Sequence, residues 1–165
     1  MKQRGAALIV SLVMLLLMTM IGIFAMRTGV MQEKMASNLI DRELAEKAAE
    51  VALRDAEKTI LSWANAPIAL PDGANNVWKK NTMAQNPASV SAWWMQADAN
   101  WWQANGIASP RSVGSIEDPR YIIEEITPLG IQPGIPPSTR YYRVTARGVG
   151  GSTQAIVILQ STVQL

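Results

Sequence analysis

The feature that most constrains this chain is an uncharged stretch near its N-terminus. Residues 6 to 26, AALIVSLVMLLLMTMIGIFAM, carry no charged side chain. A helix rising about 1.5 Å per residue spans the roughly 30 Å hydrocarbon core of a bilayer over such a length. Lys2 and Arg4 precede the stretch, and a positive flank keeps an N-terminus in the cytoplasm. The sequence therefore predicts a transmembrane helix, with the bulk of the chain in the periplasm.

This segment has two simple interpretations, a cleaved secretory signal peptide and a plain membrane anchor. A secretory signal peptide has an apolar core of about 7 to 15 residues that ends at a small-residue cleavage site. Here the run is longer, and only Ala25 near its end resembles such a site. A plain uncleaved membrane anchor is the stronger alternative, and the residues of the run alone leave it open.

The helix is expected to continue far beyond the membrane. No glycine or proline occurs from Val30 to Ala66, which predicts an unbroken helix from Ala6 to about Trp63. Its second half is amphipathic, with charged residues opposite a stripe of small and apolar ones: Ala45, Ala48, Ala49, Ala52, Leu53, Ala56, Ile60 and Trp63. Because the stripe is mostly alanine, whatever packs there can approach the helix backbone closely. Between residues 27 and 43 the apolar side chains lie on several faces without a sustained heptad, so we expect several neighbours rather than a coiled coil.

The middle of the chain, residues 65 to 120, is broken by prolines and predicts loops with one or two short helices. Val90 to Gln103 has the best helical pattern. It holds four of the six tryptophans, Trp93, Trp94, Trp101 and Trp102. Tryptophan buries a large apolar area, which favours a role as the core of a small subdomain. The alternative is an exposed aromatic surface that contacts a partner.

The C-terminal part predicts an antiparallel meander of three strands, Tyr121 to Thr127, Arg140 to Arg147 and Ser152 to Val163. In the second strand, Tyr142, Val144 and Ala146 share one face. Gly148 to Gly151 is a turn signal between the last two strands. One face of this sheet is expected to cover the alanine stripe. The predicted fold class is therefore α+β, a long N-terminal helix packed on a small antiparallel sheet.

Composition argues against catalysis. The chain has no histidine and no cysteine, which removes the commonest general base, metal ligand and nucleophile. We therefore expect no enzyme activity, no cofactor and no metal site. The acidic pairs Glu117-Asp118 and Glu124-Glu125 do not have the spacing of a calcium loop.

Charge gives no reason to expect a nucleic acid partner. The net charge is +2, and two positive charges lie in the short segment before the helix. Arg140, Arg143 and Arg147 could form a basic strip along one strand. We expect this strip to be a solvated face of the sheet rather than a DNA contact.

The N-terminal residues resemble a known family. Arg4-Gly5-Ala6, placed directly before a long uncharged helix, is similar to the leader of type IV prepilins. Residues 4 to 57 resemble the PilX-type minor pilins in particular, notably in MQEKMASNL (31 to 39) and AAEVALRDAE (48 to 57). The C-terminal YYRVTARGVGGSTQAIVILQS looks like the end of the same family. The resemblance implies a pilin-like fold, cleavage by the prepilin peptidase after Gly5, and N-methylation of Ala6.

The sequence departs from the general pilin pattern at Val10. Major pilins carry a glutamate at this position, and its carboxylate neutralises the N-terminal ammonium of a subunit inserted earlier into the apolar filament core. Val10 cannot do so. The resemblance therefore implies a subunit that enters where no earlier ammonium needs a partner, at the filament tip. A second departure is Ala6, where Phe or Met is more usual.

These inferences divide the chain into five parts: a prepilin leader (1–5), a transmembrane half-helix (6–26), an amphipathic periplasmic half-helix (27–64), a Trp- and Pro-rich variable region (65–120) and a β-meander (121–165). The expected function is that of a non-catalytic minor pilin that primes a type IV pilus or sits at its tip. Its expected partners are other minor pilins and the major pilin, through the N-terminal helix, and a tip adhesin. A K-type pseudopilin of type II secretion and a periplasmic binding module with an uncleaved anchor remain alternatives.

Overall fold

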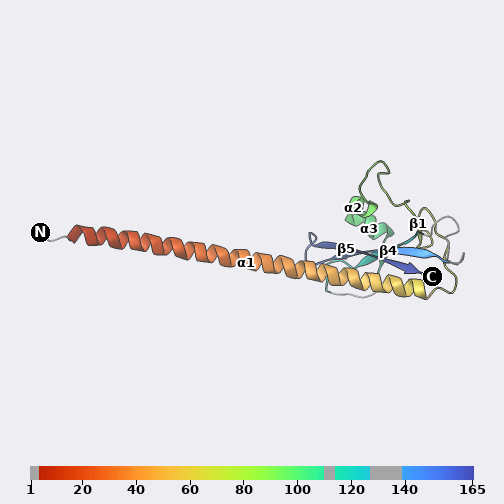
Figure 1. Cartoon of the computed structure of the whole chain (residues 1–165), viewed down its shortest axis with the longest axis horizontal. Coiled ribbons are helices and arrows are strands. Elements are labelled where there is room, and N and C mark those ends of the chain that lie inside the picture. Colours follow the sequence, from red (N-terminus) through yellow and green to blue (C-terminus); the bar gives the residue numbers. More distant parts are fainter. Residues whose placement is uncertain (1–3, 110–113, 127–138) are drawn as a thin grey trace. The chain divides into compact units, whose positions relative to one another are not determined.

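The computed structural model describes residues 4–109, 114–126 and 139–165 (Figure 1). Its first element, helix α1, runs from Arg4 to Leu61 without a break, which confirms the long helix that the sequence predicts. The chain divides into two compact units, Met1–Ile40 and Asp41–Leu165. The first unit contributes only helix to the described structure, and the second contains the end of α1 together with every strand.

Within the first unit, the few polar side chains of the apolar stretch are satisfied by the helix itself. The hydroxyls of Ser11 and Thr19 donate to the carbonyls three residues earlier, at 2.9 and 2.8 Å. Just after this stretch, the Thr28 hydroxyl donates to the Phe24 carbonyl, four residues earlier, at 3.0 Å. A hydroxyl bonded in this way adds little cost to burial in lipid or among other helices. The apolar character of this stretch is therefore preserved despite its polar residues.

The second unit is built on a five-stranded sheet. Its strands are β1 (Trp78–Lys79), β2 (Ile107–Ala108), β3 (Arg120–Glu125), β4 (Tyr141–Val149) and β5 (Ile156–Gln164). Strands β3, β4 and β5 form the predicted antiparallel meander. The two short strands both pair with β3, β1 parallel and β2 antiparallel, which makes the sheet mixed. The described residues of this unit also form two short helices, α2 (Trp93–Gln96) and α3 (Ala99–Asn105).

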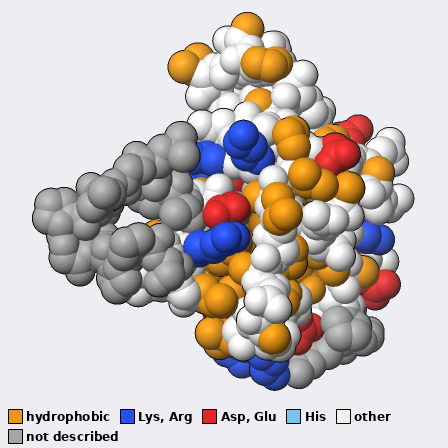
Figure 2. Space-filling model, turned by 90° about the vertical axis from the view of Figure 1, so that its right-hand side faces the viewer, with side chains coloured by type: hydrophobic (Ala, Val, Ile, Leu, Met, Phe, Trp, Pro, Cys, Tyr) orange, Lys and Arg blue, Asp and Glu red, His pale blue; other side chains and the backbone are white. Residues whose placement is uncertain are grey.

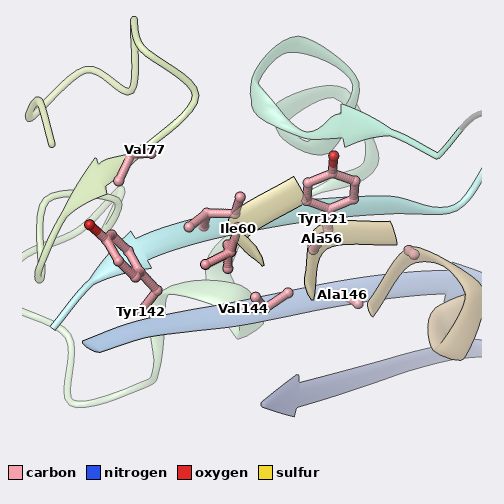
Figure 3. Close-up of a cluster of buried hydrophobic side chains, with 9 residues drawn as sticks. Ala56, Ile60, Val77, Tyr121, Tyr142, Val144 and Ala146 are labelled. Atoms are coloured by element: carbon pink, nitrogen blue, oxygen red, sulfur yellow. The ribbon is translucent and has the colours of Figure 1, made fainter. Parts of the chain in front are cut away.

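One face of the sheet packs on the alanine stripe of α1, as the sequence predicts. Ala45, Ala48, Ala49, Ala52, Ala56 and Ile60 are all fully buried. Figure 3 shows Ala56 and Ile60 of the helix against Tyr121 of β3 and Tyr142 and Val144 of β4. The helix and the two central strands thus share one hydrophobic core.

The backbones of helix and sheet approach each other closely at Gly148 of β4. A Cβ atom placed on this residue would lie 2.1 Å from the carbonyl oxygen of Ala45 and 2.4 Å from the backbone nitrogen of Ala49. Both are backbone atoms of α1, so neither can move aside as the end of a side chain would. Only glycine therefore allows β4 to lie this close to the helix.

Asp41, the first residue of the second unit, ties the β4–β5 turn to α1. Its carboxylate accepts hydrogen bonds from the backbone N–H of Gly151, from the backbone N–H of Ser152 at 3.1 Å, and from the Ser152 hydroxyl. The hydroxyl bond is the main cause that lowers the pKa of Asp41 below its usual value of 3.8. This contact joins residues more than a hundred positions apart at the point where the second unit begins.

Two sequence predictions needed correction in detail. The helix expected over Val90 to Gln103 is two short helices, because Ala97 is extended and ends the first, while Asp98 caps the second by accepting from the Trp101 N–H at 2.7 Å. Gly148 and Val149, expected in a turn, belong to β4, and the turn is closed instead by a bond from Gly150 N–H to the Ala155 carbonyl at 2.8 Å. The last residue of the first predicted strand, Thr127, lies outside the described residues.

We predict that Gly148→Ala destabilises the second unit by about 2 to 3 kcal/mol, because the new methyl group overpacks against rigid backbone. Gly151→Ala is the matched control, since its Cβ would meet only the Asp41 carboxylate, at 3.3 Å. Urea unfolding of the full chain in detergent, followed by tryptophan fluorescence, measures both variants, because all six tryptophans lie in the second unit. Equal midpoints for the two variants would contradict the close contact at Gly148.

A second prediction concerns pH. A carboxyl group whose pKa is lowered by folding stabilises the protein above its unfolded pKa, and this contribution is lost as the pH falls through the folded value. Asp41→Asn should therefore lower the unfolding midpoint at neutral pH, and the difference from wild type should shrink below the usual carboxyl pKa of 3.8. Glu43→Gln is the control, because Glu43 pairs with Lys47 at an exposed surface and contributes little. A difference between Asp41→Asn and wild type that is the same at pH 7 and at about pH 3 would argue against this role.

Candidate assembly surfaces

The residues of the expected processing site lie at the start of the described helix. Arg4, Gly5 and Ala6 form the first turn of α1. Val10 follows about one turn later, with 59% of its surface exposed. A bond in the first turn of a helix is a place that fraying can open to an enzyme. Cleavage itself stays a prediction.

The apolar stretch after this point is suited to anchoring the chain in a membrane. By length and composition α1 can cross a bilayer, and its most apolar window has a mean hydropathy of 2.7 with none of it buried. Apolar side chains are exposed all around the helix here, as in a segment that is surrounded by lipid or by other helices. Exposed apolar residues continue past the membrane-length stretch to Met31, Met35, Leu39 and Ile40.

The tryptophan-rich region covers the second face of the sheet. Trp93 and Trp102 are buried, together with Trp78, Met83 and Ile122, while Trp94 and Trp101 are half-buried at the edge of this group. We call these seven residues the tryptophan layer. The ring of Trp93 lies 5.3 to 5.7 Å from those of Trp94, Trp101 and Trp102. The layer is therefore a second core, and the exposed parts of Trp94 and Trp101 are what remains for a partner.

The arginines of β4 correct the expectation of a solvated basic strip. Arg147 is buried and pairs with Glu117 at 2.7 Å, and the Nε of Arg143 donates to Glu124 at 2.8 Å. Glu124 is itself 1% exposed and also accepts from the backbone N–H of Asn81 at 2.9 Å. Charges buried in this way are acceptable because each has an opposite charge and further hydrogen bonds. They hold the tryptophan layer's side of the sheet together and do not form a basic surface.

A groove of about 330 Å³ lies between the tryptophan layer and strand β5. Trp94, Met95 and Trp102 line one side, and Ile156 and Ile158 of β5 line the other. The face of the molecule in Figure 2 also shows hydrophobic side chains gathered near its middle, with charged side chains around them. Surfaces of this kind are typical of association with other proteins.

A catalytic or metal site has less support in the described residues than an assembly surface. Among the described residues there is no group of three or more His, Cys, Asp or Glu side chains that could hold a metal ion. The carboxylates of Asp41, Asp55, Glu117 and Glu124 are each engaged in hydrogen bonds or ion pairs within the fold. What the second unit offers is structural contacts and an apolar groove.

A long helix with an apolar first part, whose end packs on a small sheet, is the layout of a pilin-class subunit. Two family models match the chain: PilX N-terminal over residues 4–54, and type IV pilus assembly protein PilX C-term over residues 47–165. The chain therefore belongs to the PilX family of type IV pilus assembly proteins, which confirms the resemblance seen in the sequence. No match was found among curated proteins or among solved structures. The family is a structural pilin class, and membership implies interaction with other pilus components.

Proposed function

We propose that this chain is a non-catalytic minor pilin that primes assembly of a type IV pilus or sits at its tip. Until assembly it is held in the inner membrane by residues 6–26, with residues 27–165 in the periplasm. The family matches support a role in the pilus rather than in type II secretion. The orientation rests on Lys2 and Arg4 before the apolar stretch.

The first step of this function is processing. Cleavage by the prepilin peptidase after Gly5 removes both charged residues of the leader and leaves a helix that starts at Ala6. The new N-terminus becomes N-methylated. Without its leader, the helix has no charged side chain before Arg27 and can pass from lipid into a bundle of similar helices.

Val10 is the observation on which the tip position depends. An N-terminal ammonium in an apolar filament core is costly unless a carboxylate neutralises it. A subunit with valine at this position supplies no such carboxylate, so it is best placed where no earlier ammonium lies beneath it. The first subunits of the filament, which become its tip, meet this condition.

The partners follow from the surfaces. The exposed apolar residues of α1, up to Ile40, contact the helices of other minor pilins and of the major pilin. The tryptophan layer of the second unit, which includes Trp93, Trp94, Trp101 and Trp102, faces a tip adhesin. Because Trp93 and Trp102 are buried, the contact falls to Trp94, Trp101 and the groove beside them.

Intact mass and N-terminal sequencing of the chain from membranes and from sheared filaments test this function. We expect a chain that begins at an N-methylated Ala6, and we expect this form to be lost in cells without the prepilin peptidase. Gly5→Leu should block cleavage because it alters the cleavage site. Gly22→Leu is the matched control, since a side chain there meets nothing within 4 Å and leaves the leader intact.

A chain that still begins at Met1 or Lys2 with the peptidase present would overturn the pilin function. It would leave the plain membrane anchor. Equal processing of the Gly5→Leu and Gly22→Leu variants would show that the cut lies elsewhere.

A further inference from the structure

Strand β5 has a free edge. It is the last strand of the sheet, paired with β4 on one side, and no other described strand pairs with it. Arg140 and Leu165 exchange backbone hydrogen bonds at 3.0 and 2.9 Å across the end of this pair. In an antiparallel ladder the direction of these bonds alternates along the strand. The N–H and C=O groups that point away from β4 therefore belong to Ile156, Ile158, Gln160, Thr162 and Gln164.

This edge lacks the devices by which proteins usually prevent strands from pairing. Short length, lysine, proline and bulges are the common ones. β5 is nine residues long, and the side chains from Ser152 to Leu165 include no charge and no proline. Its pairing with β4 runs in one continuous register from Val149 and Ile156 to Tyr141 and Gln164. The edge is thus a ready template for another strand.

The groove described above adjoins the same edge. Ile156 and Ile158, which point their backbone groups outward, also line the groove together with Met95, which is 76% exposed. Three charged residues line the groove: Glu117 and Arg147 neutralise each other at 2.7 Å, and the Asp98 carboxylate accepts the Trp101 N–H at 2.7 Å. A strand added here would place alternate side chains on the groove side of the sheet. An uncharged segment with a large apolar side chain next to the two isoleucines matches this environment.

A second copy of the chain matches it poorly. If two copies paired antiparallel through all nine residues of β5, Gln160 of one copy would lie opposite Gln160 of the other. It places Gln164 of one copy opposite Ile156 of the other, and Thr162 opposite Ile158. Polar side chains would then lie beside the apolar groove, which would remain unfilled.

We propose that β5 is a docking strand, whose free edge and adjoining groove bind an extended, uncharged segment of another pilus component by strand addition. Backbone hydrogen bonds provide affinity, and the groove selects the apolar side chain, as in other cases of β-augmentation. The inference rests on the proposed function, because it supplies the contact between this subunit and a partner in the pilus.

Hydrogen exchange resolved to single amides tests the docking. The full chain is compared alone in detergent and in the complex with the pilus components that copurify with it from membranes of its host. We expect the outward amides of Ile158, Gln160 and Thr162 to exchange at least tenfold more slowly in the complex. The amides that face β4 should be protected in both samples.

A pair of substitutions separates edge pairing from folding. Thr162→Pro removes a backbone N–H that points away from β4, so every hydrogen bond between β5 and β4 is kept. Proline is tolerated at edge positions of this kind. It should reduce the amount of pilus components retained by at least tenfold, whereas Thr162→Val should retain them. If the proline variant has a lower unfolding midpoint, Thr162→Lys replaces it, because Thr162 is exposed and a lysine on a strand edge opposes pairing. Gln154→Lys in the preceding turn is its control.

Several results would overturn the proposal. Slowed exchange confined to residues 6–40, with β5 unchanged, would place the whole contact on the helix and leave the pilin function intact. Protection of the β5 edge in the chain alone, at the mass of a dimer, would make the occupant a second copy. Equal retention of partners by Thr162→Pro and Thr162→Val would also exclude strand addition. Failure of the proposed function is seen separately, as a chain that keeps Met1.

Discussion

The contact between the backbone of α1 and strand β4 is the interaction on which the rest of the second unit depends. Alanines on the helix and Gly148 on the strand bring the two backbones so close that an added Cβ would lie 2.1 Å from the Ala45 carbonyl oxygen. Alanine buries little area on its own, but farther along the same helix two more alanines and Ile60 pack with Tyr121 and Tyr142 of the sheet into one core. The sheet is thereby attached to the same continuous helix that carries the apolar, membrane-length stretch.

With one face committed to the helix, the other parts of the sheet take different roles. The second face is closed by the tryptophan layer and by two ion pairs that each have one buried partner, Arg147 with Glu117 and Glu124 with Arg143. Asp41 fixes the β4–β5 turn to the helix where the unit begins. Among the described residues, β5 is the longest strand that pairs with another strand on one side only. Stability thus resides in the two faces, and the edge is available for association.

The sequence predicted those structural features that depend on local residue patterns. The glycine- and proline-free run gave the helix, the alanine stripe gave its buried side, and alternation in 141–147 gave the central strand. The sequence also favoured the tryptophans as a core, which their burial confirms. It did not predict the ion pairs beside that core, because Arg143 and Arg147 look like solvent-facing residues until their acidic partners are located. Glu117 is 30 residues from its arginine, and Asp41 is 111 from Ser152. Contacts at such separations leave no periodic signal, whereas the family resemblance at residues 4–57 was confirmed by the family models.

The position of the subunit in the filament can be measured directly. A short epitope tag inserted beside Val90, an exposed residue outside the strands, leaves both faces and the edge of the sheet intact. The proposed function, in which a subunit with Val10 enters at the start of assembly, predicts that immunogold labelling of intact pili places gold at one end of each filament. Gold distributed along the shaft, or absent from filaments that carry normal amounts of major pilin, would contradict a tip or priming role.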